Sequence, residues 1–307
     1  MSDSLLIVGS VAYDSVETPT GIRVDALGGS ATFAAAAASL FTPVDLVGIV
    51  GDDFDLAGLS FVTDRGVDLT GLEIRKGGKT FRWSGVYETD VNIRHTRSTD
   101  LNVFADFNPT LPAKYRSDDV VFLGNMLPSL QQRVLEQTTN PIWVALDTMD
   151  LWINTTREEL LDVMRKVQMV IINDSEARLL TGESNLVRAA QNVLTLGPTA
   201  VVVKKGEHGV FLVMKEGFAV LPALPLENVV DPTGAGDSFA GGMLGALNAT
   251  RDFSLDGLKR AMAYGTATAS LTCEAFSIDA LKTANRDELN YRYEKLRGIA
   301  SLPPLSV

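Results

Sequence analysis

This 307-residue sequence contains one cysteine, two histidines and no excess of basic residues. The single thiol, Cys273, excludes an internal disulfide, and with two well-separated histidines it leaves no zinc constellation. Acidic residues outnumber basic ones by 38 to 27, a net charge of −11, so no basic block can neutralise nucleic-acid phosphates. No apolar run approaches the ~20 residues that span a bilayer, and residues 1–10 show no export signal. We therefore expect a cytoplasmic protein with small-molecule partners and neither nucleic acid nor membrane as a partner.

The most informative segment that is present is DPTGAGDSF, residues 231–239. Gly234 and Gly236 let backbone N–H groups turn inward, and the helix that follows adds the positive end of its dipole, so the segment suits an anion such as a phosphate. Asp237 would repel a phosphate unless it accepts a proton from an attacking hydroxyl, so we interpret it as a catalytic base beside Gly234, Ala235 and Gly236. The structural alternative is a tight loop with a capping Asp.

Two better-known phosphate motifs do not fit this sequence. The dinucleotide fingerprint GxGxxG requires a glycine where Phe239 stands, and it would follow the first strand rather than lie late in the chain. Gly78, Lys79 and Thr80 match the end of a P-loop, but its first glycine would fall on Glu73 and the flanking residues indicate strands. We therefore predict neither a dinucleotide site nor a P-loop.

Short apolar runs predict the strands of an α/β fold, with alanine-rich or polar helical stretches between several of them. The runs are residues 5–10, 44–51, 120–125, 142–147, 169–174 and 200–206. Because consecutive residues within these runs are apolar, without alternation, they indicate strands that are covered on both faces. We predict a three-layer, doubly wound, mostly parallel sheet with ligands at the carboxyl ends of its strands.

Residues 77–108 break this pattern, since polar and apolar residues alternate there without any helix signal. The alternation indicates a small antiparallel sheet inserted into an α/β domain made of residues 1–76 and 109–307. An ordinary hairpin with an exposed face is the alternative. The aromatic residues expected to face either a ligand or a second subunit are Trp83, Tyr87 and Phe104.

As a whole, residues 231–239 resemble the C-terminal signature of the PfkB family, the ribokinase-like carbohydrate and nucleoside kinases. The resemblance extends over nearly the whole chain. It implies a ribokinase-like fold in which residues 77–108 form a lid that closes over the acceptor and excludes water. It also implies transfer of the γ-phosphate of ATP to a hydroxyl of a small sugar or sugar-like alcohol, with Mg²⁺ as cofactor. K⁺ held near Asp231 and Thr233 is a further implication of the family.

The resemblance implies an acceptor site as well. Asp14 matches an acidic residue that hydrogen-bonds acceptor hydroxyls, and Gly28 and Gly29 match a glycine pair that brings the backbone close to the substrate. Many relatives have Asn where Phe33 stands, and Phe cannot supply the hydrogen bonds of a carboxamide, so the substrate is left open. The other residues expected at the acceptor are Arg82, Asn125 and Asp147, with Arg94 as a second cation of the lid.

A nucleotide and metal site is implied by two further segments. Asn173 and Glu176 match an N-x-x-E arrangement that holds Mg²⁺ through its waters, although a helix N-cap with an acidic first turn explains them nearly as well. The expected nucleotide-binding residues are Lys204, Lys205, Gly206, Gly209 and Thr233. The lysines could neutralise transferring charge, whereas the alternative is a hairpin turn with solvated lysines.

Two other functions remain open at this stage. A nucleoside kinase is favoured by the aromatic residues of the lid and by Phe33, which could stack on a base. A non-catalytic ligand sensor on the same scaffold would require a lost base or metal ligand, and neither is lost. The sequence does not determine the acceptor or the oligomeric state, for which we expect a monomer or a lid-mediated homodimer.

Overall fold

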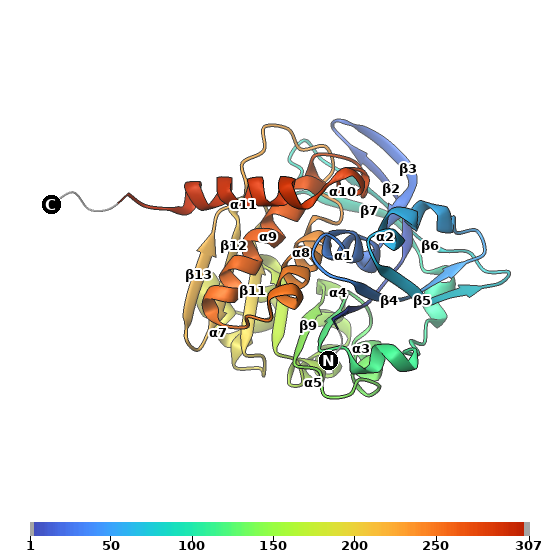
Figure 1. Cartoon of the computed structure of the whole chain (residues 1–307), viewed down its shortest axis with the longest axis horizontal. Coiled ribbons are helices and arrows are strands. Elements are labelled where there is room, and N and C mark those ends of the chain that lie inside the picture. The colour runs from blue at the N-terminus through green and yellow to red at the C-terminus, as the bar shows by residue number, and fades with distance from the viewer. Residues whose placement is uncertain (1–2, 304–307) are drawn as a thin grey trace.

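The computed structural model describes residues 3–303, and its larger sheet has nine strands in the order β13-β12-β11-β10-β9-β8-β1-β4-β5 (Figure 1). Their bounds are β1 Leu5–Val8, β4 Val44–Gly51, β5 Val67–Arg75, β8 Val120–Leu123, β9 Trp143–Asp147, β10 Met169–Asn173, β11 Ala200–Lys204, β12 Val210–Met214 and β13 Gly217–Leu221. Neighbouring strands pair in parallel except at the β11–β12 and β12–β13 pairs, which are antiparallel. The predicted mostly parallel sheet is confirmed.

Helices cover both faces of this sheet. One face packs against α1 Ser30–Ala38, α2 Ser60–Thr63, α8 Ala235–Thr250, α9 Leu255–Cys273, α10 Asp279–Thr283 and α11 Arg286–Ala300. The other face packs against α3 Pro128–Leu135, α4 Asp150–Thr155, α5 Arg157–Met164, α6 Asp174–Thr181 and α7 Leu186–Leu194. In β1, Leu5 and Ile7 face the first group whereas Leu6 and Val8 face the second, which explains why the strand is apolar at every position.

Small residues allow α1 and α8 to pack closely. All nine residues of α1 are buried, and five of them form an unbroken run of alanines. A Cβ on Gly241 of α8 would lie 2.1 Å from the carbonyl oxygen of Ala34, so only glycine permits this approach of the two backbones. The alanine-rich and glycine-rich composition of the two helices therefore sets the position of α8, whose N-terminus carries the candidate catalytic residues.

A separate four-stranded sheet has the order β3-β2-β6-β7, and Figure 1 shows it at the side of the molecule away from β13. Its bounds are β2 Ala12–Thr18, β3 Gly21–Gly28, β6 Phe81–Tyr87 and β7 Arg94–Asp100. The predicted boundary of the inserted segment was therefore incomplete, because residues 12–28 supply half of this sheet. The β2–β6 pair is parallel and places Ala12 opposite Phe81, a long-range pairing for which the sequence holds no local signal.

The carboxyl edge of the large sheet gathers polar residues. Asp147, Asn173 and Lys204 are the last residues of β9, β10 and β11, which are adjacent strands. This is the edge at which ligands bind in open α/β sheets. Among residues 3–303, no helix has the length and apolar character that crossing a membrane requires.

Candidate active site

The glycine-rich turn before α8 is held between two side chains. Gly234 has φ of 76°, a left-handed conformation that favours glycine, and a Cβ there would lie 2.4 Å from the ring of Phe33. On Gly236, a Cβ would lie 3.1 Å from Nζ of Lys204. The turn that we interpret as a phosphate site therefore lies between an aromatic ring and an ammonium group.

This packing changes the interpretation of Phe33. Its side chain is buried, with 1% of its surface exposed, and its ring contacts the Gly234 turn rather than forming an open surface for a base to stack on. We expected Phe33 at the acceptor because relatives carry Asn there. That role stays a prediction, and in this structure the ring also supports the turn, which no sequence pattern could show.

Asp237 lies in the first turn of α8, where it is partly buried. Burial, together with the nearby carboxylate of Asp147, raises the pKa of Asp237 to about 7, although Lys204 opposes this rise. A carboxylate with a pKa near neutrality can accept a proton and release it again at physiological pH, as a general base must. The structure therefore gives Asp237 the environment that the sequence interpretation requires.

Asp14 belongs to β2 of the small sheet, and its side chain is buried beside the glycine pair. A Cβ on Gly28 would lie 2.1 Å from Oδ2 of Asp14, so the absence of a side chain at Gly28 makes room for this carboxylate. The pKa of Asp14 is raised to about 7, mainly by burial and further by the charges of Asp231 and Asp237. The hydrogen bond from the N–H of Gly29 and the charge of Arg94 act in the opposite direction. The small sheet therefore brings Asp14 to the same region as Asp237.

Lys204 and Asp147 form a buried ion pair. Nζ of Lys204 lies 3.3 Å from Oδ2 of Asp147, and the side chains are 18% and 6% exposed. Burial alone would lower the pKa of Lys204, but Asp147, Glu176 and Asp237 raise it above its ordinary value. Lys204 is therefore a permanent positive charge beside the turn. The contact of Asp147 with the acceptor stays a prediction, and in this structure the carboxylate binds Lys204.

Asn173 and Glu176 form a capping box at the start of α6. The Asn173 side chain accepts the N–H of Glu176 at 2.8 Å, and Oε2 of Glu176 accepts the N–H of Asn173 at 2.8 Å. Burial raises the pKa of Glu176 to about 7 despite the charge of Lys204, so a cation nearby would favour its ionised form.

This pair fits Mg²⁺ held through water better than Mg²⁺ bound directly. The oxygen of Asn173 already accepts two hydrogen bonds, from the backbone of Glu176 and from the hydroxyl of Ser175. Within residues 3–303, no cluster of three or more His, Cys, Asp or Glu side chains is arranged to hold a metal. Oxygen donors with waters between them and the ion are typical of Mg²⁺ sites.

The loop that precedes α8 is tied to the small sheet through Thr233. The N–H of Thr233 donates to Oδ1 of the buried Asp231 at 2.9 Å, and its hydroxyl donates to the hydroxyl of Tyr87 at 3.0 Å. Tyr87 lies at the end of β6, opposite Arg94, whose guanidinium lies 5.4 Å from the ring centroid of Trp83. One face of the small sheet therefore touches the loop that carries Asp237. Phe104 stacks between Phe81 and Phe107.

The predicted nucleotide turn follows β11. Gly206 and Gly209 have φ values of 54° and 88°, and the N–H of Lys205 donates to the carbonyl oxygen of Gly209 at 2.9 Å. A Cβ on Gly206 would lie 3.2 Å from Oδ1 of Asn92, a residue between β6 and β7. The tip of the small sheet thus reaches this turn, a contact that the sequence did not predict.

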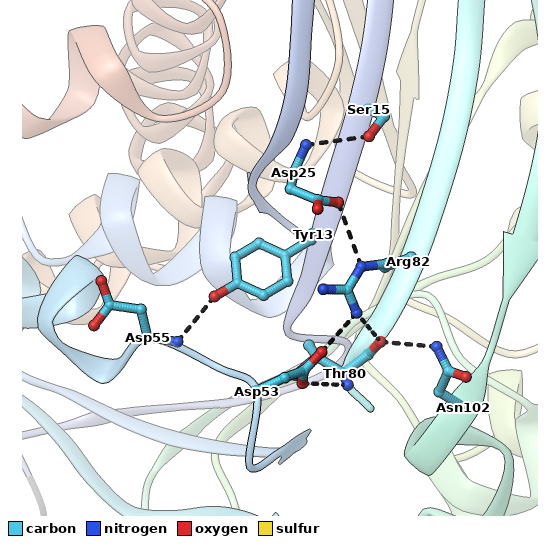
Figure 2. Close-up of polar contacts among 8 residues, drawn as sticks. All are labelled: Tyr13, Ser15, Asp25, Asp53, Asp55, Thr80, Arg82 and Asn102. Atoms are coloured by element: carbon cyan, nitrogen blue, oxygen red, sulfur yellow. Dashed lines mark hydrogen bonds and ion pairs between the residues drawn. The ribbon is translucent and has the colours of Figure 1, made fainter. Parts of the chain in front are cut away.

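Arg82 does not lie where the sequence analysis placed it. Side chains alternate along a strand, so Arg82 and its β2 neighbour Tyr13 occupy the face opposite to Asp14 and Trp83. Figure 2 shows its guanidinium between Asp53 and Asp25, at 2.7 Å and 3.3 Å. Arg82 is therefore a structural residue of the small sheet and not an acceptor contact in this structure.

The same contacts join the small sheet to the α/β domain. Oδ1 of Asp53, in the loop after β4, accepts the N–H and the hydroxyl of Thr80 at 2.7 Å and 2.6 Å. The hydroxyl of Tyr13 accepts the N–H of Asp55 at 2.9 Å in the same loop (Figure 2). These bonds fix the base of β6, where the chain enters the small sheet.

We expect replacement of Asp53 by Asn to weaken the attachment of β6 to the loop after β4. The variant loses a charged acceptor of three hydrogen bonds, which corresponds to about 1–3 kcal/mol in the free energy of unfolding. Thermal unfolding and hydrogen exchange of residues 81–100 measure the effect. Asp64→Asn, an exposed carboxylate on α2's C-cap, is the control, and equal behaviour of the two variants would contradict the prediction.

Asn125 follows β8, but its carboxamide is already engaged. Its oxygen accepts the indole N–H of Trp152 at 2.9 Å, and its nitrogen lies 3.2 Å from the sulfur of Met149. A role for Asn125 at the acceptor therefore stays a prediction, since its side chain hydrogen-bonds with α4 and the N-cap residue of that helix.

Comparisons with known proteins agree on one family. A family model described as pfkB family carbohydrate kinase matches residues 3–283. A cytidine kinase of Thermococcus kodakarensis is 30% identical over 254 residues, covering 80% of this chain and 89% of that protein. The nucleoside kinase structure of Methanocaldococcus jannaschii superimposes with a TM-score of 0.76 at 22% identity, covering 96% of this chain and 99% of that chain.

A further solved structure with the same fold, from Escherichia coli, is a complex with ATP and Mg²⁺. Its TM-score is 0.73 at 18% identity, and it covers 95% of this chain and 99% of that chain. The fold of the larger sheet with its separate small sheet is therefore shared with proteins that hold these two ligands.

Proposed function

Because this chain belongs to the pfkB family of carbohydrate kinases, we propose that it transfers the γ-phosphate of ATP to a hydroxyl of a nucleoside, with Asp237 as the base. The sequence analysis placed a sugar or sugar-like alcohol first and a nucleoside second. The cytidine kinase, which matches 80% of the chain at 30% identity, favours the reverse order. A free sugar stays the second candidate, because the family includes both classes of acceptor and Asp14 would suit hydroxyls of either.

The observation that carries this proposal is that Asp237 follows a glycine-rich turn at the start of α8 and lies close enough to Asp14 to raise the pKa of that carboxyl group. The N–H groups of residues 234–237 at the start of α8 would hold the transferring phosphoryl group, aided by the dipole of a 16-residue helix. Asp14, with the Gly28 and Gly29 backbone, would orient the acceptor hydroxyl toward Asp237, which accepts its proton as the new oxygen–phosphorus bond forms.

The remaining residues of the site would neutralise and align the phosphates. Mg²⁺, reached from Asn173 and Glu176 through water, would screen the negative charge of ATP. Lys204 would add a fixed positive charge, and the turn at Lys205, Gly206 and Gly209 would lie against the nucleotide. The lid would exclude water, which otherwise competes with the acceptor for the phosphoryl group.

Three finer points stay predictions. A monovalent cation such as K⁺ beside Thr233 is supported by the buried Asp231, whose carboxylate accepts the N–H groups of Thr233 and Ser277. A cytoplasmic location, and a monomer or lid-mediated homodimer, come from the sequence analysis alone. The ligand sensor is disfavoured because the base and the proposed metal-binding pair are both present.

An assay of ADP release over a panel of nucleosides and free sugars tests the proposed function. We expect at least one nucleoside to support turnover with a kcat/KM well above that of ribose or fructose. The phosphorylated product would be identified by mass spectrometry. Turnover of sugars alone would favour the second candidate, and ligand binding without any turnover would favour the sensor.

We expect kcat/KM to fall as the pH drops below about 7. The pKa of Asp237 is raised to about 7 by burial and by Asp147, so the base loses its ionised form below that pH. One pH unit below the pKa leaves about a tenth of the carboxylate ionised, so the rate at pH 6 should be roughly tenfold below its plateau. A rate that stays constant from pH 5.5 to 8.5 would contradict this assignment.

A further inference from the structure

Lys204 reaches across the end of a neighbouring strand to meet Asp147. Lys204 ends β11 and Asp147 ends β9, and β10 lies between these strands. In the described part of the chain, Asp147 is the only hydrogen-bond partner of the Lys204 ammonium. A lysine side chain at a strand end ordinarily has several accessible rotamers. The hydrogen bond to Asp147 on β9 restricts the Lys204 side chain to the rotamers that extend across β10.

That direction runs along the phosphate-binding turn. The Nζ, Cε and Cδ atoms of Lys204 lie 3.1, 3.7 and 3.8 Å from the position that a Cβ on Gly236 would occupy. The last three atoms of the side chain therefore lie alongside the backbone at Gly236, the residue that precedes Asp237 in the chain. An ammonium group has three N–H donors, of which Asp147 engages one.

Each oxygen of the Asp147 carboxylate accepts a hydrogen bond from the protein. Oδ1 accepts the N–H of Thr148 at 2.9 Å and Oδ2 accepts Lys204 at 3.3 Å, while the side chain is 6% exposed. Its backbone carbonyl also accepts the Gln131 side chain at 2.9 Å. These contacts hold Asp147 in place and leave it poorly placed to bind an acceptor hydroxyl.

The positive charge of Lys204 offsets the negative charge of the carboxylates at this edge of the sheet. Asp147, Glu176 and Asp237 are all close enough to act on Lys204, so without the lysine three carboxylates would face an incoming phosphate. Phosphoryl transfer depends mainly on alignment and on neutralising charge over the phosphate oxygens. An ammonium group that is fixed before the nucleotide binds does not have to move when negative charge develops on the phosphoryl group during transfer.

We propose that Asp147 is a positioning residue, which holds the Lys204 ammonium against the turn at Gly236 so that this ammonium contacts the phosphoryl group in transfer. Lys204 is then a catalytic residue, and Asp147 acts only through it. The inference rests on the proposed kinase function, and it assigns Asp147 to the phosphate rather than to the acceptor.

A double-mutant cycle of Asp147→Leu, Lys204→Met and both together tests this proposal, with Lys215→Met as the control. Lys215 is exposed in the turn between β12 and β13, so its replacement removes one positive charge far from the turn at Gly236. The measured quantities are kcat, the KM of the acceptor, the melting temperature, and the dissociation constant of MgADP. The last is measured by calorimetry with aluminium fluoride present, which occupies the place of the transferring phosphoryl group. Asp147→Asn, which keeps one acceptor oxygen, is a fourth variant.

We expect Lys204→Met to lower kcat about 10²-fold, and Asp147→Leu to lower it at least about tenfold. The double variant should equal Lys204→Met within about threefold, because Asp147 has nothing left to position. Asp147→Asn should show an intermediate loss. The KM of the acceptor should stay within about threefold in all variants, and MgADP affinity should follow the same non-additive pattern.

Several results would overturn the proposal. An acceptor KM that rises in Asp147→Leu, with effects that add in the double variant, would assign Asp147 to the acceptor. A lower melting temperature with unchanged kcat and MgADP affinity would make the pair structural only. The single variant Asp147→Leu leaves the Lys204 charge buried and unpaired, whereas the double variant has two apolar side chains. If only the single variant fails to fold, the comparison of Lys204→Met with the double variant still tests whether Asp147 has any effect once Lys204 is gone.

The same experiment separates this inference from the proposed function. If the wild-type protein phosphorylates no acceptor, the proposed function fails, but the MgADP cycle still reports whether Asp147 acts through Lys204. Additive losses of MgADP affinity, or no loss in either single variant, would then reject the positioning role independently of turnover.

Discussion

Replacement of Asp237 by Asn is expected to lower kcat by about 10² to 10⁴-fold while the KM values of ATP and the acceptor stay within about threefold. The amide keeps the shape of the carboxylate but cannot accept the proton of the acceptor hydroxyl. The backbone N–H groups of residues 234–237 and the Lys204 ammonium are unchanged in this variant, so substrate binding should persist. Steady-state kinetics with the best acceptor of the panel measures the effect.

The same variant should be more stable than the wild type above neutral pH. The pKa of Asp237 in the folded protein, about 7, lies above its ordinary value of 3.8, so its ionisation opposes folding once the pH exceeds that range. A rise of this size corresponds to at most about 4 kcal/mol at pH 8, and the gain should disappear toward pH 4. A lower kcat together with a higher melting temperature is the signature of a functional residue in a strained environment.

Asp256→Asn is the matched control for this prediction. Asp256 also lies in the first turn of a long helix, α9, but its side chain is exposed. Its replacement should change neither kcat nor melting temperature appreciably. Near-normal turnover in Asp237→Asn would exclude Asp237 as the base, whatever the behaviour of the control.

Gly234→Ala is expected to abolish most of the activity for a different reason. The left-handed φ of 76° costs a non-glycine residue about 1–2 kcal/mol, and the new Cβ would lie 2.4 Å from the Phe33 ring. Either the turn or the ring must move, and a displacement of about 1 Å in a phosphate-binding turn is enough to lower kcat about 10²-fold. Kinetics and thermal unfolding measure both consequences.

Two other glycine variants make this prediction specific. Gly236→Ala should be milder, because its Cβ meets the flexible end of Lys204 at 3.1 Å and its φ is not left-handed. Gly298→Ala, exposed on α11 with nothing within 4 Å of its Cβ, should be neutral or slightly stabilising. Equal losses in all three would show that the Gly234 turn has no special role.

The clash with Phe33 can be isolated by a second substitution. In Phe33→Ala with Gly234→Ala, the ring is gone and only the backbone cost of the left-handed residue remains. The double variant should therefore recover part of the kcat lost in Gly234→Ala. If it recovers none, the ring does not support the turn.

Much of the architecture followed from local patterns in the sequence. Runs such as residues 169–172 are apolar throughout because helices cover both faces of the sheet, so their burial could be predicted without knowing their partners. The string from Asp231 to Phe239 specified the turn and the helix that follows it, because glycine positions and a helix start are local properties. The family assignment was predicted from the same string.

Which side chains meet was decided by the tertiary structure alone. Arg82 and Arg94 lie in the same predicted β segment, yet only the strand register places Arg94 on the face of Asp14 and Arg82 against Asp53. Phe33 and Gly234 lie about two hundred residues apart, and so their contact has no signature in either segment.

The amino-acid order by itself therefore determined the α/β class, the glycine-rich turn before α8 and the place of Asp237 in the first turn of that helix, because each depends on residues that are neighbours in the chain. The tertiary structure decided that residues 12–28 join the small sheet, that Phe33 supports the turn, and that Asp147 binds Lys204. These features depend on strand pairing and side-chain direction, which long-range packing sets and local sequence does not encode.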